Sequence, residues 1–146
     1  MDFCIKTFEE LTLSELYEIL RLRSEVFVVE QDCVYQDVDN KDSKALHVTG
    51  TKNGQIIAYA RLFKAGDYFD QASIGRVVVK QSERMYGYGH ILMKEAIQGI
   101  EKFYNTREIK ISAQYYLEKF YASHGFVSVG ETYLEDGIPH IAMIRK

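Results

Sequence analysis

The sequence contains little of several residue types that define particular classes of protein. Its 146 residues include no tryptophan, one proline (Pro139) and two cysteines, Cys4 and Cys33. Two cysteines are too few for a disulfide framework or a zinc site, so we expect reduced thiols and no metal. No uninterrupted apolar run approaches the roughly 20 residues of a membrane span, and Met1 to Phe8 lacks the basic start and apolar core of a signal peptide. We therefore expect a cytoplasmic protein.

The chain also lacks a large excess of either charge. Its formal net charge is −3, which gives no general electrostatic argument for nucleic acid or an anionic membrane as a partner. Apolar residues make up 47% and charged residues 27%, as in ordinary globular proteins. The length fits one domain over residues 1–146, and no repeat, low-complexity tract or linker divides it.

Hydrophobic periodicity predicts runs of strands separated by isolated helices. The turn Asn53-Gly54 fits a tight type I′ hairpin, and the polar segments Asp32 to Ser43 and Lys64 to Ala72 are expected as loops. This order favours an α/β fold of the α+β type, with a mixed, mostly antiparallel sheet of about seven strands and three or four helices on its faces. The expected strands are 2–8, 45–52, 55–63, 74–79, 108–113, 126–133 and 140–144, and the expected helices are 12–30, 88–103 and 115–123.

A strand, a glycine loop and a helix start follow one another in the middle of the chain. The β-branched run Val77, Val78 and Val79 predicts a buried strand, and Gly87 and Gly89 lie between it and the next helical pattern. Such a loop turns several backbone N–H groups toward one point, and the following helix adds the positive end of its dipole. The pattern therefore predicts an anion-binding site.

The spacing of this loop excludes two common phosphate loops. A nucleoside triphosphate loop needs Gly-Lys-Ser/Thr, whereas His90 and Ile91 follow Gly89 here. A dinucleotide fingerprint needs a third glycine where Leu92 stands. Instead, the residues from Arg84 to Gly89 spell Arg-x-x-Gly-x-Gly directly after a hydrophobic strand, and this resembles the pyrophosphate loop of the GNAT N-acetyltransferases.

A second motif downstream strengthens this resemblance. Ile111-Ser-Ala-Gln114 is followed by Tyr121-Ala-Ser-His-Gly125-Phe126, which is similar to the strand, polar residue, helix, tyrosine and Gly-Phe of that family. The order of elements resembles the GNAT fold as well, apart from a second early helix, for which 32–43 is too polar. The resemblance covers about Leu20 to Met143.

Further segments resemble the ElaA-like branch of the GNAT proteins. They are Arg23-Ser-Glu-Val-Phe-Val-Val-Glu-Gln31, Asp39-Asn-Lys-Asp42, His47 and the tail from Glu135 to Met143. The Arg-x-x-x-Phe and Asp-x-x-Asp parts are also similar to acyl-homoserine-lactone synthases, which share the fold. Those enzymes usually carry a tryptophan where Cys33 stands, which counts against that alternative.

The resemblance implies acetyl-CoA as a co-substrate and an amine as the acceptor. It implies that backbone groups of the central strand hold the pantetheine arm and that the glycine loop holds the pyrophosphate. The expected cofactor-binding residues are Val77, Val78, Val79, Arg84, Met85, Tyr86, Gly87, Tyr88, Gly89, His90 and Gln114.

The resemblance also implies that Tyr121 is the general acid that protonates the departing thiolate; the alternative is that Tyr121 belongs only to the core. The central strand offers no glutamate, so a base has to come from elsewhere or act through water. Glu30, His47 and His140 are the candidates, and each has an alternative structural or surface role. The amine would attack directly, so that covalent catalysis by Cys33 is not needed.

Three functional hypotheses follow. The favoured one is an N-acetyltransferase for a small amine or a peptide amine; the others are an acyltransferase that makes a signal molecule and a catalytically silent acyl-CoA-binding module. The acidic residues Asp37, Asp39 and Asp42 lack the glycine and glutamate of a calcium loop, and we interpret them as a solvated loop or as an attractant for a cationic amine. The resemblance leaves a homodimer open.

Overall fold

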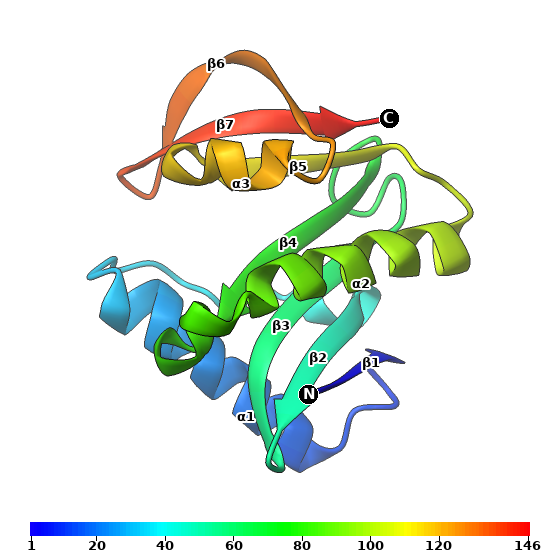
Figure 1. Cartoon of the computed structure of the whole chain (residues 1–146), viewed down its shortest axis with the longest axis vertical. Coiled ribbons are helices and arrows are strands. Elements are labelled where there is room, and N and C mark those ends of the chain that lie inside the picture. The colour runs from blue at the N-terminus through cyan, green and yellow to red at the C-terminus, as the bar shows by residue number, and fades with distance from the viewer.

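The computed structural model describes residues 1–146 and contains one seven-stranded sheet with helices on both faces (Figure 1). No helix combines the length and hydrophobicity needed to cross a membrane. The strands are β1 (Asp2–Thr7), β2 (Leu46–Lys52), β3 (Gln55–Phe63), β4 (Ala72–Val79), β5 (Ile109–Gln114), β6 (Val127–Glu135) and β7 (Ile138–Arg145). The helices are α1 (Leu13–Arg23), α2 (Tyr88–Tyr104) and α3 (Glu118–Ala122), with a π-helix η1 (Ser24–Glu30) and 3₁₀ turns η2 (Asp42–Lys44), η3 (Gln81–Tyr86) and η4 (Tyr115–Leu117).

The two central strands of the sheet diverge. The strand order is β1-β2-β3-β4-β5-β7-β6, and every neighbouring pair is antiparallel except β4 and β5. These two pair only through Ala72 with Ile109 and Ser73 with Lys110, and then separate, as Figure 1 shows. From Gly75 to Val79, β4 pairs with β3 alone. One edge of β4 therefore faces an open space inside the sheet.

Helices bury a separate core on each face. On one face, α2 and Tyr121 of α3 pack into a core of 19 buried residues. On the other face, Ile19 and Leu22 of α1 pack with Val78 in a core of six. One face of α2 is buried in the larger core, whereas Ile91 of the same helix is 42% exposed. The buried residues of α2 are Leu92, Met93, Ala96, Ile97, Gly99 and Ile100.

Local sequence signals fix several element boundaries. Thr12 and Glu15 form a reciprocal capping box at the start of α1. Asn53 and Gly54 have φ angles of 52° and 77°, which confirms the expected hairpin turn between β2 and β3. Gly125 follows α3 with a φ of 91°, the left-handed conformation that is usual for a glycine after a helix C-terminus.

A bulge interrupts β4 where the strand passes the open space. Tyr59 pairs with Val78 and Arg61 with Gly75, so β4 carries one residue more than β3 over this stretch. Arg76 lies in the bulge with a φ of 47°, a left-handed conformation that costs roughly 1–2 kcal/mol for an L-residue with a side chain. The expected strand over this segment is therefore present but bent.

The first helix changes its winding before it ends. The expected helix over 12–30 forms, but it is α-helical only to Arg23 and continues as the π-helix η1 from Ser24 to Glu30. π-helical turns are rare and are frequently found at functional sites. Here η1 contributes Val26, Phe27 and Glu30 to the cavity described below.

Candidate active site

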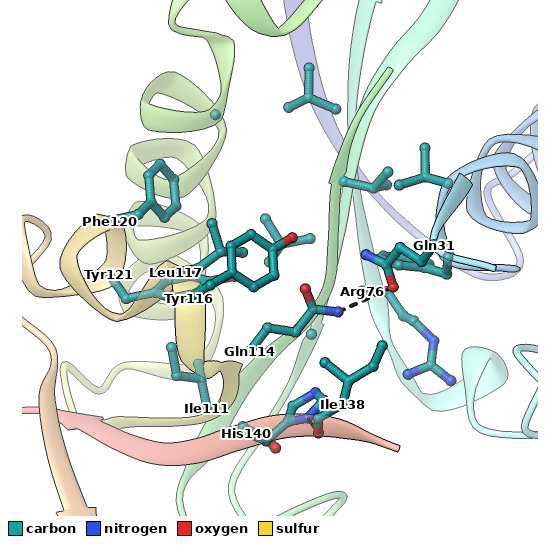
Figure 2. Close-up of a pocket in the computed structure, with 18 of the residues that line it drawn as sticks. Gln31, Arg76, Ile111, Gln114, Tyr116, Leu117, Phe120, Tyr121, Ile138 and His140 are labelled. Atoms are coloured by element: carbon teal, nitrogen blue, oxygen red, sulfur yellow. Dashed lines mark hydrogen bonds between the residues drawn. The ribbon is translucent and has the colours of Figure 1, made fainter. Parts of the chain in front are cut away.

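A cavity of about 510 Å³ occupies the space between the diverging strands β4 and β5. Its size lies in the range of roughly 300–1,000 Å³ that is usual for small-molecule sites. Figure 2 shows that Gln114 and His140 face Gln31 and Arg76 across it, with Tyr116 and Phe120 from the α3 side. Its walls come from η1, β4, the glycine loop, β5, α3 and the turn between β6 and β7.

The glycine loop presents an uncapped helix N-terminus at one end of the cavity. Gly87, with φ 73°, precedes α2, and no side chain caps the helix. The first backbone N–H groups of α2 and the positive end of its dipole are therefore available to an anion. A side chain at Gly87 would be strained by this φ angle, whereas a Cβ at Gly89 would make an ordinary 3.5 Å contact with the Phe120 ring. The loop therefore presents backbone donors that can bind a phosphate group.

The side chain of Arg84 holds this loop in place. Its Nε donates to the carbonyl oxygen of Val79 at 3.0 Å, and its two terminal nitrogens donate to both carboxylate oxygens of Glu30 at 2.6 and 2.9 Å. All three guanidinium nitrogens are thus already hydrogen-bonded within the protein. If Arg84 contacts a phosphate, it does so through its backbone. Both oxygens of Glu30 are likewise engaged, which argues against Glu30 as a free base.

The other expected loop residues divide into two groups. Gly87, Gly89 and His90 line the cavity, as do Val77, Val78, Val79 and Gln114. Met85, Tyr86 and Tyr88 do not. Met85 is 79% exposed, and Lys52 lies over the rings of Tyr86 and Tyr88 at 4.3 and 5.3 Å. These two tyrosines therefore pack around a lysine instead of facing the cavity.

Tyr121 lies at the boundary between the core and the cavity. It is 7% exposed, belongs to the larger core and lines the cavity. Its ring makes edge contacts with Phe120 and Phe126 at centroid distances of 5.1 and 6.1 Å, while its hydroxyl makes no hydrogen bond within the protein. Burial raises the pKa of this phenol. The hydroxyl thus stays protonated and has no competing partner.

His140 has one ring nitrogen fixed and one free to accept a proton. Its Nδ1 lies 2.7 Å from the carbonyl oxygen of Ile138, and since a carbonyl only accepts, Nδ1 carries the hydrogen in this contact. In the neutral ring, Nε2 is then the acceptor. It lies 3.4 Å from a carboxylate oxygen of Glu135, and His140 lines the cavity.

His47 lies outside the cavity and has no free nitrogen. It is 1% exposed, its Nδ1 is 2.6 Å from the Tyr59 hydroxyl, and its Nε2 is 2.9 Å from the carbonyl oxygen of Asp42. Burial lowers the pKa of His47, which favours the neutral ring. Its surroundings are those of a structural histidine.

The acidic loop is paired with arginines, so the interpretation as a solvated loop is wrong. Arg23 is fully buried and donates to Asp37 at 2.9 Å and to Asp42 at 2.8 Å. Arg61 is 1% exposed and donates to Asp39 at 2.6 Å and to Asp42 at 3.0 Å. Although burial opposes it, hydrogen bonds from both arginines lower the pKa of the Asp42 carboxyl. These carboxylates are therefore engaged with the protein, and not with a substrate.

Arg76 connects this network to the cavity. Its Nε lies 2.7 Å from a carboxylate oxygen of Asp37 without pointing its hydrogen at it, and its Nη2 donates to the Asp37 carbonyl oxygen at 3.0 Å. The same arginine occupies the bulge of β4 and lines the cavity. Sequence reasoning missed it, although a charged residue within the apolar run of a central strand was a usable signal.

Gln31 and Cys33 also line the cavity, and sequence reasoning gave neither as a site residue. Gln114 donates to the side-chain oxygen of Gln31 at 3.2 Å, which is the dashed line in Figure 2. The buried thiol of Cys33 donates to the carbonyl oxygen of Asp136 at 3.3 Å. These contacts join residues 83 and 103 positions apart, and no local pattern signals them. The structure contains no group of three or more His, Cys, Asp or Glu side chains placed to hold a metal ion.

The open sheet, the glycine loop and the cavity between β4 and β5 are the features expected of a GNAT-type acyltransferase, and comparison with known proteins agrees with this class. The profile of the family described as "Acetyltransferase (GNAT) domain" matches residues 9–146. The chain belongs to the GNAT acetyltransferase family, in its ElaA-like branch. It is 42% identical over 139 residues to protein ElaA of Escherichia coli strain K12, which covers 94% of this chain and 91% of ElaA.

Two solved structures show the same fold. The crystal structure of an acyl-CoA N-acyltransferase from Pseudomonas aeruginosa is 44% identical, with a TM-score of 0.94 and all of both chains covered. The crystal structure of Escherichia coli ElaA gives a TM-score of 0.93, also over all of both chains, with 38% identity in that superposition. The GNAT-type fold expected from the sequence is therefore confirmed.

Proposed function

We propose that this protein transfers an acetyl group from acetyl-CoA to a primary amine of a small molecule or peptide, by direct attack in a ternary complex. One observation supports this most strongly. A single cavity contains the uncapped N-terminus of α2, the free edge of β4 and the unbonded hydroxyl of Tyr121. We place this activity in the cytoplasm, as the sequence predicts.

The residues of the loop and of β4 would bind and orient the co-substrate. Backbone N–H groups near Gly87 and Gly89 would hold the diphosphate, and the free edge of β4 from Val77 to Val79 would pair with the amide-containing pantetheine arm as an added strand does. Acetyl-CoA bound there would supply the thioester. A backbone N–H of the bulged segment would polarise its carbonyl, and the fixed orientation would lower the barrier further.

His140 and Tyr121 would handle the protons. Of the three candidate bases, Glu30 is paired with Arg84 and His47 lies outside the cavity. His140 lines the cavity, and its Nε2 makes no hydrogen bond. It would accept the proton of the attacking amine. Tyr121 would donate a hydrogen bond or a proton to the departing thiolate. Because burial raises the pKa of Tyr121 further above that of a thiol, the hydrogen bond is the larger part of this role.

The test is thiol release from acetyl-CoA in the presence of a panel of primary amines, with the acetylated product identified by mass spectrometry. Release that depends on the amine, with mass gain of one acetyl group, is the expected result. Saturable binding of acetyl-CoA without release for any amine would support the silent binding module instead. Faster release from long-chain acyl-CoA than from acetyl-CoA would favour an acyltransferase that makes a signal molecule.

A further inference from the structure

The charged residues that line the cavity leave an uncompensated negative charge at the end away from the glycine loop. Arg84 is paired with Glu30 at 2.6 Å, and Arg76 with Asp37 at 2.7 Å. The remaining charged lining residues are Glu135, the last residue of β6, and Asp136, which follows it in the turn to β7. No lysine lines the cavity. The positive helix end thus faces one part of the cavity and two carboxylates face the other.

His140 lies at the carboxylate end and is 7% exposed. Its Nδ1 is bonded to the Ile138 carbonyl oxygen, and its Nε2 lies 3.4 Å from a carboxylate oxygen of Glu135. A donor on a ligand in the cavity, such as a protonated amine, would find two acceptors here, the Nε2 of the neutral ring and the Glu135 carboxylate. Figure 2 shows the His140 ring beside Ile138 at this end.

Much of the cavity wall is apolar or aromatic. Phe27, Tyr35, Tyr116 and Ile138 line the cavity together with Cys33, whose thiol is already bonded to the Asp136 backbone. Such walls suit a methylene chain, which gains roughly 0.8 kcal/mol for each buried CH₂ group. A carboxylate on the acceptor would have to enter beside Glu135 and Asp136 and would be repelled by both.

We propose that the acceptor is an aliphatic diamine or polyamine, which rests on the acetyltransferase function proposed above. One nitrogen, in its neutral form, attacks the thioester carbon and loses its proton to Nε2 of His140; the N–C bond forms and the C–S bond breaks. The thiolate leaves with a hydrogen bond from the Tyr121 hydroxyl and is protonated by solvent, to which His140 releases the proton that it accepted. A second, protonated nitrogen of the acceptor lies against the carboxylates of Glu135 and Asp136. Asp37, Asp39 and Asp42, which the sequence offered for this role, are unavailable because arginines neutralise them.

The test compares three acceptors of similar length in the thiol-release assay: 1,5-diaminopentane, pentylamine and 5-aminopentanoate. All three carry one reacting amine, and they differ at the other end of the chain, which is a positive ammonium group, a methyl group or a negative carboxylate, respectively. We expect kcat/KM to fall by about tenfold at each step of this series. In the double variant Glu135→Gln, Asp136→Asn, the ratio of kcat/KM for diaminopentane to kcat/KM for pentylamine should fall to about one. Because both values are measured on the same variant, a general loss of activity cancels in this ratio. Glu131→Gln, an exposed carboxylate of β6 outside the cavity, is the matched control and should keep the ratio.

Each outcome separates the two proposals. Equal kcat/KM for the three acceptors, or a preference for 5-aminopentanoate, overturns the inference about the acceptor and leaves the transferase in place. A ratio that survives in the double variant shows that other groups select the substrate and overturns the assignment to Glu135 and Asp136. Absence of thiol release with every amine overturns the transferase and this inference together.

Discussion

Arg84 and Glu30 form a two-pronged ion pair, with nitrogen-to-oxygen distances of 2.6 and 2.9 Å, that ties the glycine loop to the end of the π-helix η1. The third nitrogen of Arg84 donates to the Val79 carbonyl oxygen at the end of β4. One side chain therefore connects three elements that border the cavity. The loop is held in shape before any anion arrives, which lowers the ordering cost of binding.

Glu30→Gln should weaken acetyl-CoA binding with little effect on the chemical step. Partly exposed ion pairs contribute roughly 0.2–1 kcal/mol, so we expect KM for acetyl-CoA to rise up to about fivefold and kcat to change less than about twofold. Steady-state kinetics measures both. Glu25→Gln removes a comparable exposed pair with Arg21 away from the cavity and should change neither constant. A loss of kcat of about a hundredfold or more would instead make Glu30 the base.

Tyr121→Phe should lower turnover and preserve the cavity. The substitution keeps the ring contacts with Phe120 and Phe126 and removes only the hydroxyl, so we expect kcat to fall by about tenfold to a hundredfold. The dissociation constant for acetyl-CoA, measured by calorimetry, should stay within about twofold. Tyr104→Phe, at the far end of α2, is the control. Unchanged turnover in Tyr121→Phe would show that Tyr121 only packs in the core and does not take part in catalysis.

Asp42→Ala should be among the most destabilising substitutions of a charged residue. Asp42 accepts from both Arg23 and Arg61, and its removal leaves two buried guanidinium groups short of a partner. Breaking a buried pair in this way costs roughly 3–5 kcal/mol. Urea denaturation measures the loss, and Asp67→Ala, in the loop between β3 and β4, should change stability by less than about 0.5 kcal/mol. A similar small loss for Asp42→Ala would show that the network adds little to stability.

Stability should fall on acidification in two stages. Burial lowers the pKa of His47, so below the ordinary histidine pKa the unfolded chain binds a proton that the folded chain does not, and stability falls with pH. At lower pH, Asp39 and Asp42 follow, because arginine contacts outweigh burial and lower their pKa values below those of the unfolded chain. Urea titrations at a series of pH values check both stages. Burial also lowers the pKa of His124, which contributes to the same stage. His47→Gln should therefore reduce the first stage and keep the second; an unchanged profile would contradict the assignment to His47.

Signals that act within one element predicted most of the fold. The Thr12 capping box, the Asn53-Gly54 turn and Gly87 before α2 each fix a boundary through the conformation of neighbouring residues. The order of strands and helices followed from the same periodicities. The resemblance to GNAT proteins then joined these parts into one sheet, because spacing alone does not state which strands pair.

Features that depend on distant partners could not be predicted. The bulge at Arg76 requires the pairing of β4 with β3, and the acidic loop is held by Arg23, Arg61 and Arg76 from three other elements. The π-helix η1 has no sequence pattern that distinguishes it from a continuing α-helix. For the candidate site, the glycine loop and Tyr121 were found from motifs, whereas the role proposed for Glu135 and Asp136 depends on their place in the wall of the cavity.

Calorimetric titration with acetyl-CoA tests the central claim most directly, namely that the glycine loop and the free edge of β4 form a coenzyme A site. Gly87→Val forces a branched side chain into a φ of 73° at the loop, and Gly66→Val imposes similar strain at φ 93° in the loop between β3 and β4. Circular dichroism establishes that both variants fold. We expect saturable binding by the native protein and by Gly66→Val, and a loss of at least about tenfold in affinity for Gly87→Val. No binding by the native protein, or equal binding by both variants, would contradict this assignment.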